Sequence, residues 1–215
     1  YKFHCRSQGV SLGHLAPAVN EEIERLSELQ FTQEELDWLG QLRFIKSDFV
    51  DFLGIFRLNP KYVTVEGHPG GDLEITIKGP WLHTILFEIP LLAIINELHF
   101  ASLSDGDLAL GRQRLNEKIG KLLQPGLEHL KVADYGTRRR YSRAWQGELL
   151  GTLRDRLGTA PDGKLAGTSN THYARTLGLT PLGTMAHEYL QACQALGPRL
   201  RDSQVFGFET WAREY

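Results

Sequence analysis

The sequence predicts a mixed α/β protein, in which an N-terminal α+β layer is followed by a region of parallel strands and helices. Apolar and polar residues alternate on both sides of HPGGD, which predicts a β-hairpin, and runs with helical spacing precede and follow it. Beyond about residue 125, short strand-like runs each lead into a helical segment. With 215 residues, of which 41% are hydrophobic and 23% charged, the chain can form a folded core.

The first part of the chain carries clear signals for each element. YKFHCR at the start is strand-like, and residues 15–29 have apolar residues at helical spacing. Thr32 followed by Glu35 is the pair of a capping box, so a helix is expected there, and Ser47 is the expected N-cap of a helix over 47–56. Together with the hairpin YVTVEG and LEITIKGPW, these elements describe an α+β layer.

The most apolar stretch, TILFEIPLLAIINELHFA at 84–101, predicts a buried helix. It is interrupted by Glu88, Pro90, Asn96 and Glu97, so we expect a core helix and not a membrane span. The pattern of the first residues does not predict a signal peptide. We therefore expect a cytoplasmic protein that does not engage a membrane.

Composition excludes other classes. A net charge of −2 is not that of a general nucleic-acid binder. Cys5 and Cys193 lie far apart and predict two reduced thiols, and the histidines show no HxH or HxxxH spacing, so no metal site is expected. The chain starts without a methionine and has only Met185, so we expect a piece of a longer protein.

Three strand-helix units are expected in the second part. Their strands are KVADYG at 131–136, KLAGTSN at 164–170 and PLGTMAH at 181–187, and helical patterns follow each one. Such alternation predicts parallel strands in an α/β barrel or a doubly wound sheet. A Gly-Thr pair recurs in each unit, which indicates a common structural role.

The strand ends carry the candidate chemistry. Glycine permits a close approach of the backbone, and hydroxyl groups with helix amides suit a phosphate. The pattern places Arg138, Arg139 and Arg140 at a helix N-terminus, where they oppose the helix dipole unless an anion is bound. The simpler explanations stay open: a Gly-Thr pair can be a turn with an N-cap, the arginines can be solvated, and His187 can be an ordinary core or surface histidine.

YGTRRRYS, AGTSNTHYAR and TPLGTMAHEYLQ closely resemble three motifs of the nicotinate phosphoribosyltransferase family. The similarity extends over RFIKSDFVDFLGIFRLNP, IKGPWLHTILFEIPLLAIINEL and SQVFGFETWAREY. It implies a type II phosphoribosyltransferase fold. Residues 1–100 would form an N-terminal α+β sandwich domain, and residues 101–215 would form the first units of an irregular, TIM-like α/β barrel.

The resemblance also implies an activity in NAD biosynthesis. Nicotinate and phosphoribosyl pyrophosphate would give nicotinate mononucleotide and pyrophosphate, through a transition state like an oxocarbenium ion, with ATP and Mg²⁺ as cofactors. ATP hydrolysis would be coupled to this transfer through phosphorylation of His187, the histidine of the GTxxH motif. The enzyme would thus be both a pentosyltransferase and a ligase.

The same resemblance assigns site residues. Thr184 matches a residue that contacts nicotinate, and the others match positions that line the substrate pocket. The expected substrate-binding residues are Thr184, Tyr135, Arg138, Arg139, Thr168, Ser169 and Asn170.

Family members share their site across a homodimer, and segments that complete it do not occur in these 215 residues. We therefore expect a homodimer and no activity from this chain alone. Two other hypotheses remain. The chain could be a non-catalytic or degenerate nucleotide-binding relative, although the intact GTMAHE argues against this. It could also be another barrel enzyme, such as an aldolase, although the strand ends lack the lysine or carboxylate that such an enzyme needs.

Overall fold

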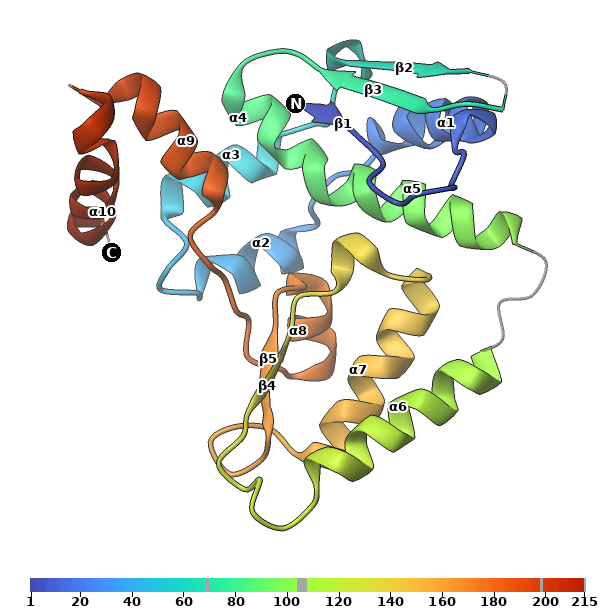
Figure 1. The fold of residues 1–215 in the computed structure, drawn as a ribbon. Helices are drawn as coiled ribbons and strands as arrows, with labels where there is room; N and C mark the ends of the chain where they lie inside the picture. The colour runs from blue at the N-terminus through green and yellow to red at the C-terminus, as the bar shows by residue number, and fades with distance from the viewer. Residues whose placement is uncertain (69, 104–107, 198, 215) are drawn as a thin grey trace.

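The computed structural model describes residues 1–68, 70–103, 108–197 and 199–214, which form a mixed α/β fold as predicted (Figure 1). An antiparallel sheet with helices beside it makes up the N-terminal part, and a parallel pair of strands with further helices follows. The long apolar helix runs between these two parts. No closed barrel is formed by the described residues.

The antiparallel sheet confirms the predicted hairpin. Its strands are β1 (Lys2–Phe3), β2 (Val63–Gly67) and β3 (Leu73–Ile77), in the order β1-β3-β2. Val63 lies opposite Ile77 at one end of the hairpin, and every second residue of β3 is buried, as expected for a sheet with one face on a core. Only two residues of the strand-like start are paired in β1.

The first helices follow short 3₁₀ turns or loops. They are η1 (Gly13–Leu15), α1 (Ala16–Leu26), α2 (Gln33–Gly40) and α3 (Ser47–Ile55), with η2 (Pro60–Tyr62) leading into β2. The capping box of Thr32 and Glu35 is confirmed. Ser47 as N-cap is wrong by one residue, because the carbonyl of Lys46 already accepts hydrogen bonds from the amides of Phe49 and Val50.

The long apolar segment is helical but divided into α4 (Trp81–Thr84), η3 (Ile85–Phe87) and α5 (Glu88–Ser102). Pro90 lacks an amide hydrogen, and it lies in the first turn of α5, where proline is tolerated. By length and composition alone, Trp81–Ser102 could cross a membrane, so the expected exclusion on composition does not hold. Within this segment, Phe87, Leu91 and Ile95 are buried in the N-terminal core with Ile75, although only 28% of its apolar window is buried.

The second part begins with a helix that the sequence patterns did not mark. Its elements are α6 (Leu108–Leu122), β4 (Val132–Asp134), η4 (Thr137–Arg139), α7 (Arg143–Leu157), β5 (Leu165–Thr168) and α8 (Thr171–Leu177). β4 and β5 are parallel, as predicted. A separate, smaller hydrophobic cluster forms around Leu150, Leu165 and Leu179.

The third predicted strand, 181–187, is wrong. Only Pro181 forms a bridge, to Thr168, while the amide of Leu182 donates to the carbonyl of Thr168. No described strand pairs with the other side of this segment, so the extended conformation is not continued as a ladder. The three Gly-Thr pairs consequently differ in place: one follows β4, one ends β5 and one lies in this segment.

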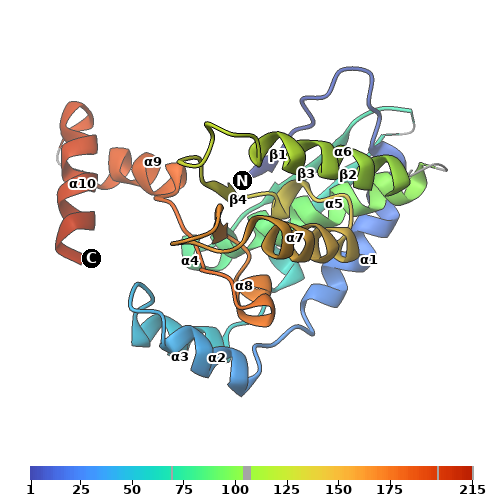
Figure 2. The same cartoon turned by 90° about the horizontal axis from the view of Figure 1, so that it is seen from below.

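The chain then forms α9 (His187–Leu196), η5 (Leu200–Asp202) and α10 (Ser203–Glu214). The helical pattern expected to continue through this region is therefore divided, with α9 ending at Gly197. Figures 1 and 2 show α9 and α10 packed on each other at one end, away from α6 and α7. An ion pair of 3.3 Å from Lys46 Nζ to Glu214 Oε1 connects α10 with the start of α3.

Candidate functional site

The ends of β4 and β5 are held together by one carboxylate, that of Asp134. Its Oδ1 accepts hydrogen bonds from the amide of Gly136 and from Gln146 Nε2, both at 3.0 Å. Its Oδ2 accepts from the hydroxyl of Thr168 at 2.7 Å. Charge-assisted hydrogen bonds of this kind are the stronger ones in proteins, so Asp134 fixes the two strand ends relative to each other and to α7.

The GTSN segment supplies this network with buried groups. Thr168 is 0% exposed, and its hydroxyl also accepts from the amide of Asn170 at 3.1 Å. Asn170 caps α8 by accepting from the amide of Tyr173, and its Nδ2 donates to Thr137 Oγ1 at 3.1 Å. Ser169 donates its amide to the carbonyl of Asp134. Thr168 and Asn170 are thus occupied with protein partners, and their contact with a substrate stays a prediction.

The arginines do not lie at the N-terminus of an α-helix. Arg138 and Arg139 are in the 3₁₀ turn η4, and α7 begins later, after its N-cap Ser142. Arg138 Nη1 is 2.6 Å from Glu88 Oε1. Arg140 Nη2 is 3.0 Å from Glu97 Oε2. Two glutamates of α5 therefore supply part of the negative charge that the arginines need. The prediction that the arginine cluster requires a bound anionic ligand is corrected accordingly.

The backbone of η4 is anchored to the same helix. Asn96 Nδ2 donates to the carbonyl of Arg138 at 3.2 Å. Two ion pairs and this hydrogen bond fix η4 along α5, from its first turn to its third. Arg139 is exposed and has no ion-pair partner among the described residues. Of the three arginines, it is the most available to an anionic ligand.

His187 is the first residue of α9, so the strand-to-helix position predicted for it is a loop-to-helix position in the structure. Its side chain is 69% exposed, and its Nε2 lies 2.9 Å from Glu188 Oε1. Thr184 is exposed on the preceding segment, and Tyr135 is exposed beyond β4. Neither side chain has a hydrogen bond to a described residue.

A cavity of about 760 Å³ brings some of these residues together. Arg138, Arg139 and His187 line it, although the arginines and the histidine are far apart in the sequence. The other predicted residues do not line it: Tyr135, Thr168, Ser169, Asn170 and Thr184. The structure therefore brings Arg138, Arg139 and His187 together around one cavity. It does not place the other predicted site residues in that cavity.

Several residues that line the cavity were not predicted from the sequence. Lys2 and Arg6 come from the N-terminal strand and its extension, and Glu88 and Glu188 come from the first turns of α5 and α9. Glu188 stands next to the candidate histidine, which is a signal that could have been used. Nothing local marks the other three, because they reach the cavity only through the packing of β1 and α5.

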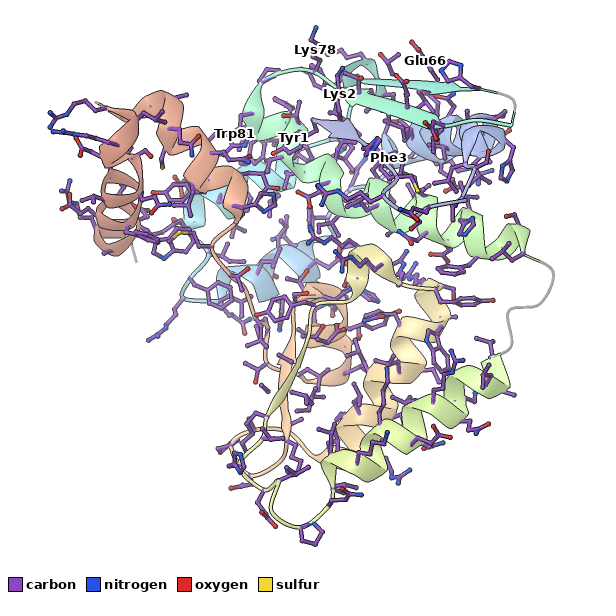
Figure 3. All side chains as sticks on the ribbon, viewed as in Figure 1. Tyr1, Lys2, Phe3, Glu66, Lys78 and Trp81 are labelled. Carbon is purple, nitrogen blue, oxygen red and sulfur yellow. The ribbon has the colours of Figure 1, made fainter. Side chains whose placement is uncertain are left out.

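The carboxyl group of Glu88 is perturbed by its neighbours in the cavity. Burial raises the pKa of Glu88, and the hydrogen bond and charge of Glu188 raise it further, while Arg138 acts in the opposite direction. Burial also raises the pKa of Tyr1, and the negative charges of Glu188 and Glu88 raise it further. A hydrogen bond with Trp81 acts in the opposite direction and lowers it. Figure 3 shows Tyr1 and Trp81 close together near the start of α4.

The described residues do not fit a dedicated metal site. No group of three or more histidine, cysteine, aspartate or glutamate side chains could hold an ion within the described ranges. Magnesium usually binds through one or two carboxylates and the phosphates of a substrate. The two free cysteines form no disulfide, as predicted.

Comparisons with known proteins match nearly the whole chain. Residues 1–96 match the model of the nicotinate phosphoribosyltransferase N-terminal domain, and residues 130–215 match that of the nicotinate phosphoribosyltransferase family. Nicotinate phosphoribosyltransferases of Acidovorax sp. (strain JS42) and Cupriavidus necator are 62% and 58% identical over the full chain. In both cases the chain covers 55% of the relative, so it spans about half the length of the curated relatives it matches.

Solved structures give the same result. The crystal structure of nicotinate phosphoribosyltransferase from Vibrio cholerae matches with a TM-score of 0.86 and 30% identity, covering all of this chain and 51% of the other. The enzyme from Porphyromonas gingivalis matches with a TM-score of 0.86 and 28% identity, with 54% of its chain covered.

Proposed function

The chain belongs to the nicotinate phosphoribosyltransferase family, and from this premise we propose that it is part of an enzyme that makes nicotinate mononucleotide. The pyridine nitrogen of nicotinate forms a bond to the anomeric carbon of phosphoribosyl pyrophosphate, and the bond from that carbon to pyrophosphate breaks. ATP is the coupled substrate. The product is a precursor of NAD.

The observation that carries this proposal is the composition of the cavity. Lys2, Arg6, Arg138 and Arg139 line it together with His187, whereas among the described residues only two carboxyl groups do so. A pocket with an excess of fixed positive charge favours a ligand with several phosphate groups. Phosphoribosyl pyrophosphate and ATP are both ligands of this kind.

Each residue then has a distinct role. His187 accepts a phosphoryl group from ATP, and Arg138 and Arg139 bind phosphate or pyrophosphate oxygens. Thr184 and Tyr135 contact nicotinate once the site is complete. Ser169 offers a hydroxyl group, and Thr168 and Asn170 hold the loop that presents it. Such a site catalyses mainly by positioning and by stabilising charge.

The wider architecture is part of the proposal. Residues 1–100 form the N-terminal sandwich domain and residues 101–215 form the first units of an irregular α/β barrel, in line with the two separate hydrophobic clusters. The enzyme is a cytoplasmic homodimer with a shared site. Mg²⁺ would arrive with the substrate phosphates, because the described side chains form no cage for it.

Radiolabelled ATP tests the role of His187. A protein of the relatives' full length that carries this sequence should take up acid-labile, base-stable phosphate, and His187→Ala should abolish it. His129→Ala is a matched control, because His129 is also exposed and does not line the cavity. Label that persists in His187→Ala, or that disappears in His129→Ala, would contradict the assignment. The 215-residue chain alone should not form nicotinate mononucleotide.

A further inference from the structure

The carbonyl group of Arg138 belongs to the peptide that joins Arg138 to Arg139. The 3₁₀ bonds of η4 use the carbonyls of Gly136 and Thr137, and no amide of the described backbone donates to the carbonyl of Arg138. Its donor is a side chain 42 residues earlier in the sequence, because Asn96 Nδ2 of α5 lies 3.2 Å from the carbonyl oxygen. This peptide of η4 is therefore held by a side chain of another element.

The orientation of the Asn96 amide group is determined by its two partners. Nδ2 also donates to the carbonyl of Leu92, one turn earlier in α5, at 2.8 Å. Both partners are carbonyl oxygens, which only accept, so the NH₂ end of the amide must face them. Because Asn96 is half-buried on a helix and uses both amide hydrogens, its side chain holds the Arg138 carbonyl in one direction.

The two arginines on either side of this peptide are held differently. The guanidinium group of Arg138 is itself fixed, with Nη1 2.6 Å from Glu88 Oε1. The side chain of Arg139 has no hydrogen bond or ion pair with a described residue, and it lines the same cavity as Arg138 and His187. The direction in which Arg139 enters the cavity is therefore set by its backbone, which depends on the peptide that Asn96 holds.

We propose that Asn96 is a positioning residue for Arg139. Its hydrogen bond restrains the rotation of the Arg138–Arg139 peptide, so that the Arg139 guanidinium group is directed at an anionic ligand in the cavity. A displacement of about 1 Å at a binding group can cost on the order of 10²-fold in rate, which makes a fixed backbone important for a long side chain without another anchor. That the ligand carries a pyrophosphate group rests on the proposed function, but the contact between α5 and η4 does not.

Glu97, the next residue of α5, offers a matched control. Its Oε2 accepts from Arg140 Nε and Nη2 at 3.1 and 3.0 Å, and its Oε1 accepts from the amide of Arg143 at 3.2 Å. These bonds hold the segment that follows η4 and the start of α7, and neither Glu97 nor Arg140 lines the cavity. Loss of the Glu97 carboxylate therefore loosens the same helix contact without removing the donor to the Arg138 carbonyl.

Calorimetric titration with inorganic pyrophosphate tests the proposal in a protein of the relatives' full length. Arg139→Ala should weaken binding by about 10- to 100-fold, the range for a hydrogen bond to a charged group. Asn96→Leu keeps the shape of the side chain and removes the donor, so it should weaken binding by about tenfold. In a protein that already carries Arg139→Ala, Asn96→Leu should add less than about a twofold effect, because residues that act through one another are not additive. Glu97→Leu should change the affinity by less than about twofold.

Hydrogen exchange of single backbone amides, followed by NMR, is a second measurement that needs no ligand. The amide of Arg139 donates to the carbonyl of Gly136 at 2.8 Å within η4. Asn96→Leu should make this amide exchange about fivefold faster, as expected from the loss of one typical hydrogen bond that holds the turn. Glu97→Leu should instead accelerate exchange at the amide of Arg143, which loses its acceptor.

Additive losses of affinity would overturn the proposal. If Asn96→Leu weakens pyrophosphate binding equally with and without the Arg139 side chain, it acts through another group. An equal loss in Glu97→Leu would show that any loosening of α5 from η4 has the same effect. If the unchanged protein binds no pyrophosphate, the proposed function fails, and the exchange rate of the Arg139 amide decides the positioning role alone: the same rate in Asn96→Leu as in the unchanged protein would exclude it.

Discussion

Replacing Thr168 by valine removes a buried hydroxyl group and keeps the shape of the side chain. The hydroxyl donates to Asp134 Oδ2 at 2.7 Å and accepts from the amide of Asn170 at 3.1 Å. Thr168 is 0% exposed, so no water can take its place at Asp134 without a rearrangement. The variant separates a structural role of this residue from the substrate contact that the motif predicts.

The expected loss follows from the two bonds. A hydrogen bond to a charged group contributes about 1.5–3 kcal/mol, and the amide of the half-buried Asn170 adds about 1 kcal/mol when it loses its acceptor. Thr168→Val should therefore lower the free energy of unfolding by about 2.5–4 kcal/mol. This is a large share of the roughly 5–15 kcal/mol that is typical of a folded domain.

Urea denaturation followed by circular dichroism measures this change. Thr176→Val is the matched control, because its hydroxyl bonds a helix carbonyl at 2.9 Å on the exposed side of α8. That variant should stay within about 0.5 kcal/mol of the unchanged protein. A Thr168→Val protein as stable as this control would refute the network around Asp134 as a source of stability.

Three further predictions concern other parts of the molecule. Gly167→Ala should cost more than about 4 kcal/mol, measured by thermal unfolding, because Gly167 has φ +149° and a Cβ there would lie 2.1 Å from the carbonyl oxygen of Thr180. Arg138→Ala in a full-length protein should lower kcat/KM on the order of 10²-fold, whereas Arg140→Ala, which removes an anchor of η4 outside the cavity, should have a much smaller effect on kcat/KM. The raised pKa of Glu88 implies that its contribution to stability is complete below the ordinary glutamate pKa of about 4.3 and is lost as the pH rises through the pKa in the folded state. As the pH is raised from about 4, the urea midpoint should therefore fall less for Glu88→Gln than for the unchanged protein.

Arg138 also shows how a structural contact changes an expectation. The sequence alone suggested an arginine that meets only a ligand, so its loss would not affect stability. The ion pair with Glu88 adds a stability cost, but the Arg138 side chain is 39% exposed, which limits the cost to about 1 kcal/mol or less. Arg138→Ala should therefore show a small decrease in stability together with the large kinetic loss.

Local patterns were enough for the class and for many elements. The hairpin, the capping box of Thr32 and Glu35, and the family motifs each depend on residues close together in the sequence. The parallel pairing of β4 and β5 joins distant segments, but the alternation of strand and helix patterns along the chain was enough to predict it. Propensity, alternation and capping are interactions within a few residues, so they can be recognised before the fold is known. The sequence determined helix boundaries less well, as the N-cap of α3 shows: Ser47 was predicted and Lys46 is observed. The reason is that the carbonyl group of either of two neighbouring residues can accept the first hydrogen bond of a helix.

By itself, then, the sequence determined the mixed α/β class, the order of most elements and the family to which the motifs belong. Only the tertiary structure decided that Thr168 is a buried structural residue, that Glu88 and Glu97 face the arginines, and that the third strand does not form. The reason is physical: an ion pair between α5 and η4, or a strand's second partner, depends on how distant segments pack. A local pattern specifies which side chains are present, but the packing of distant segments specifies which of them meet.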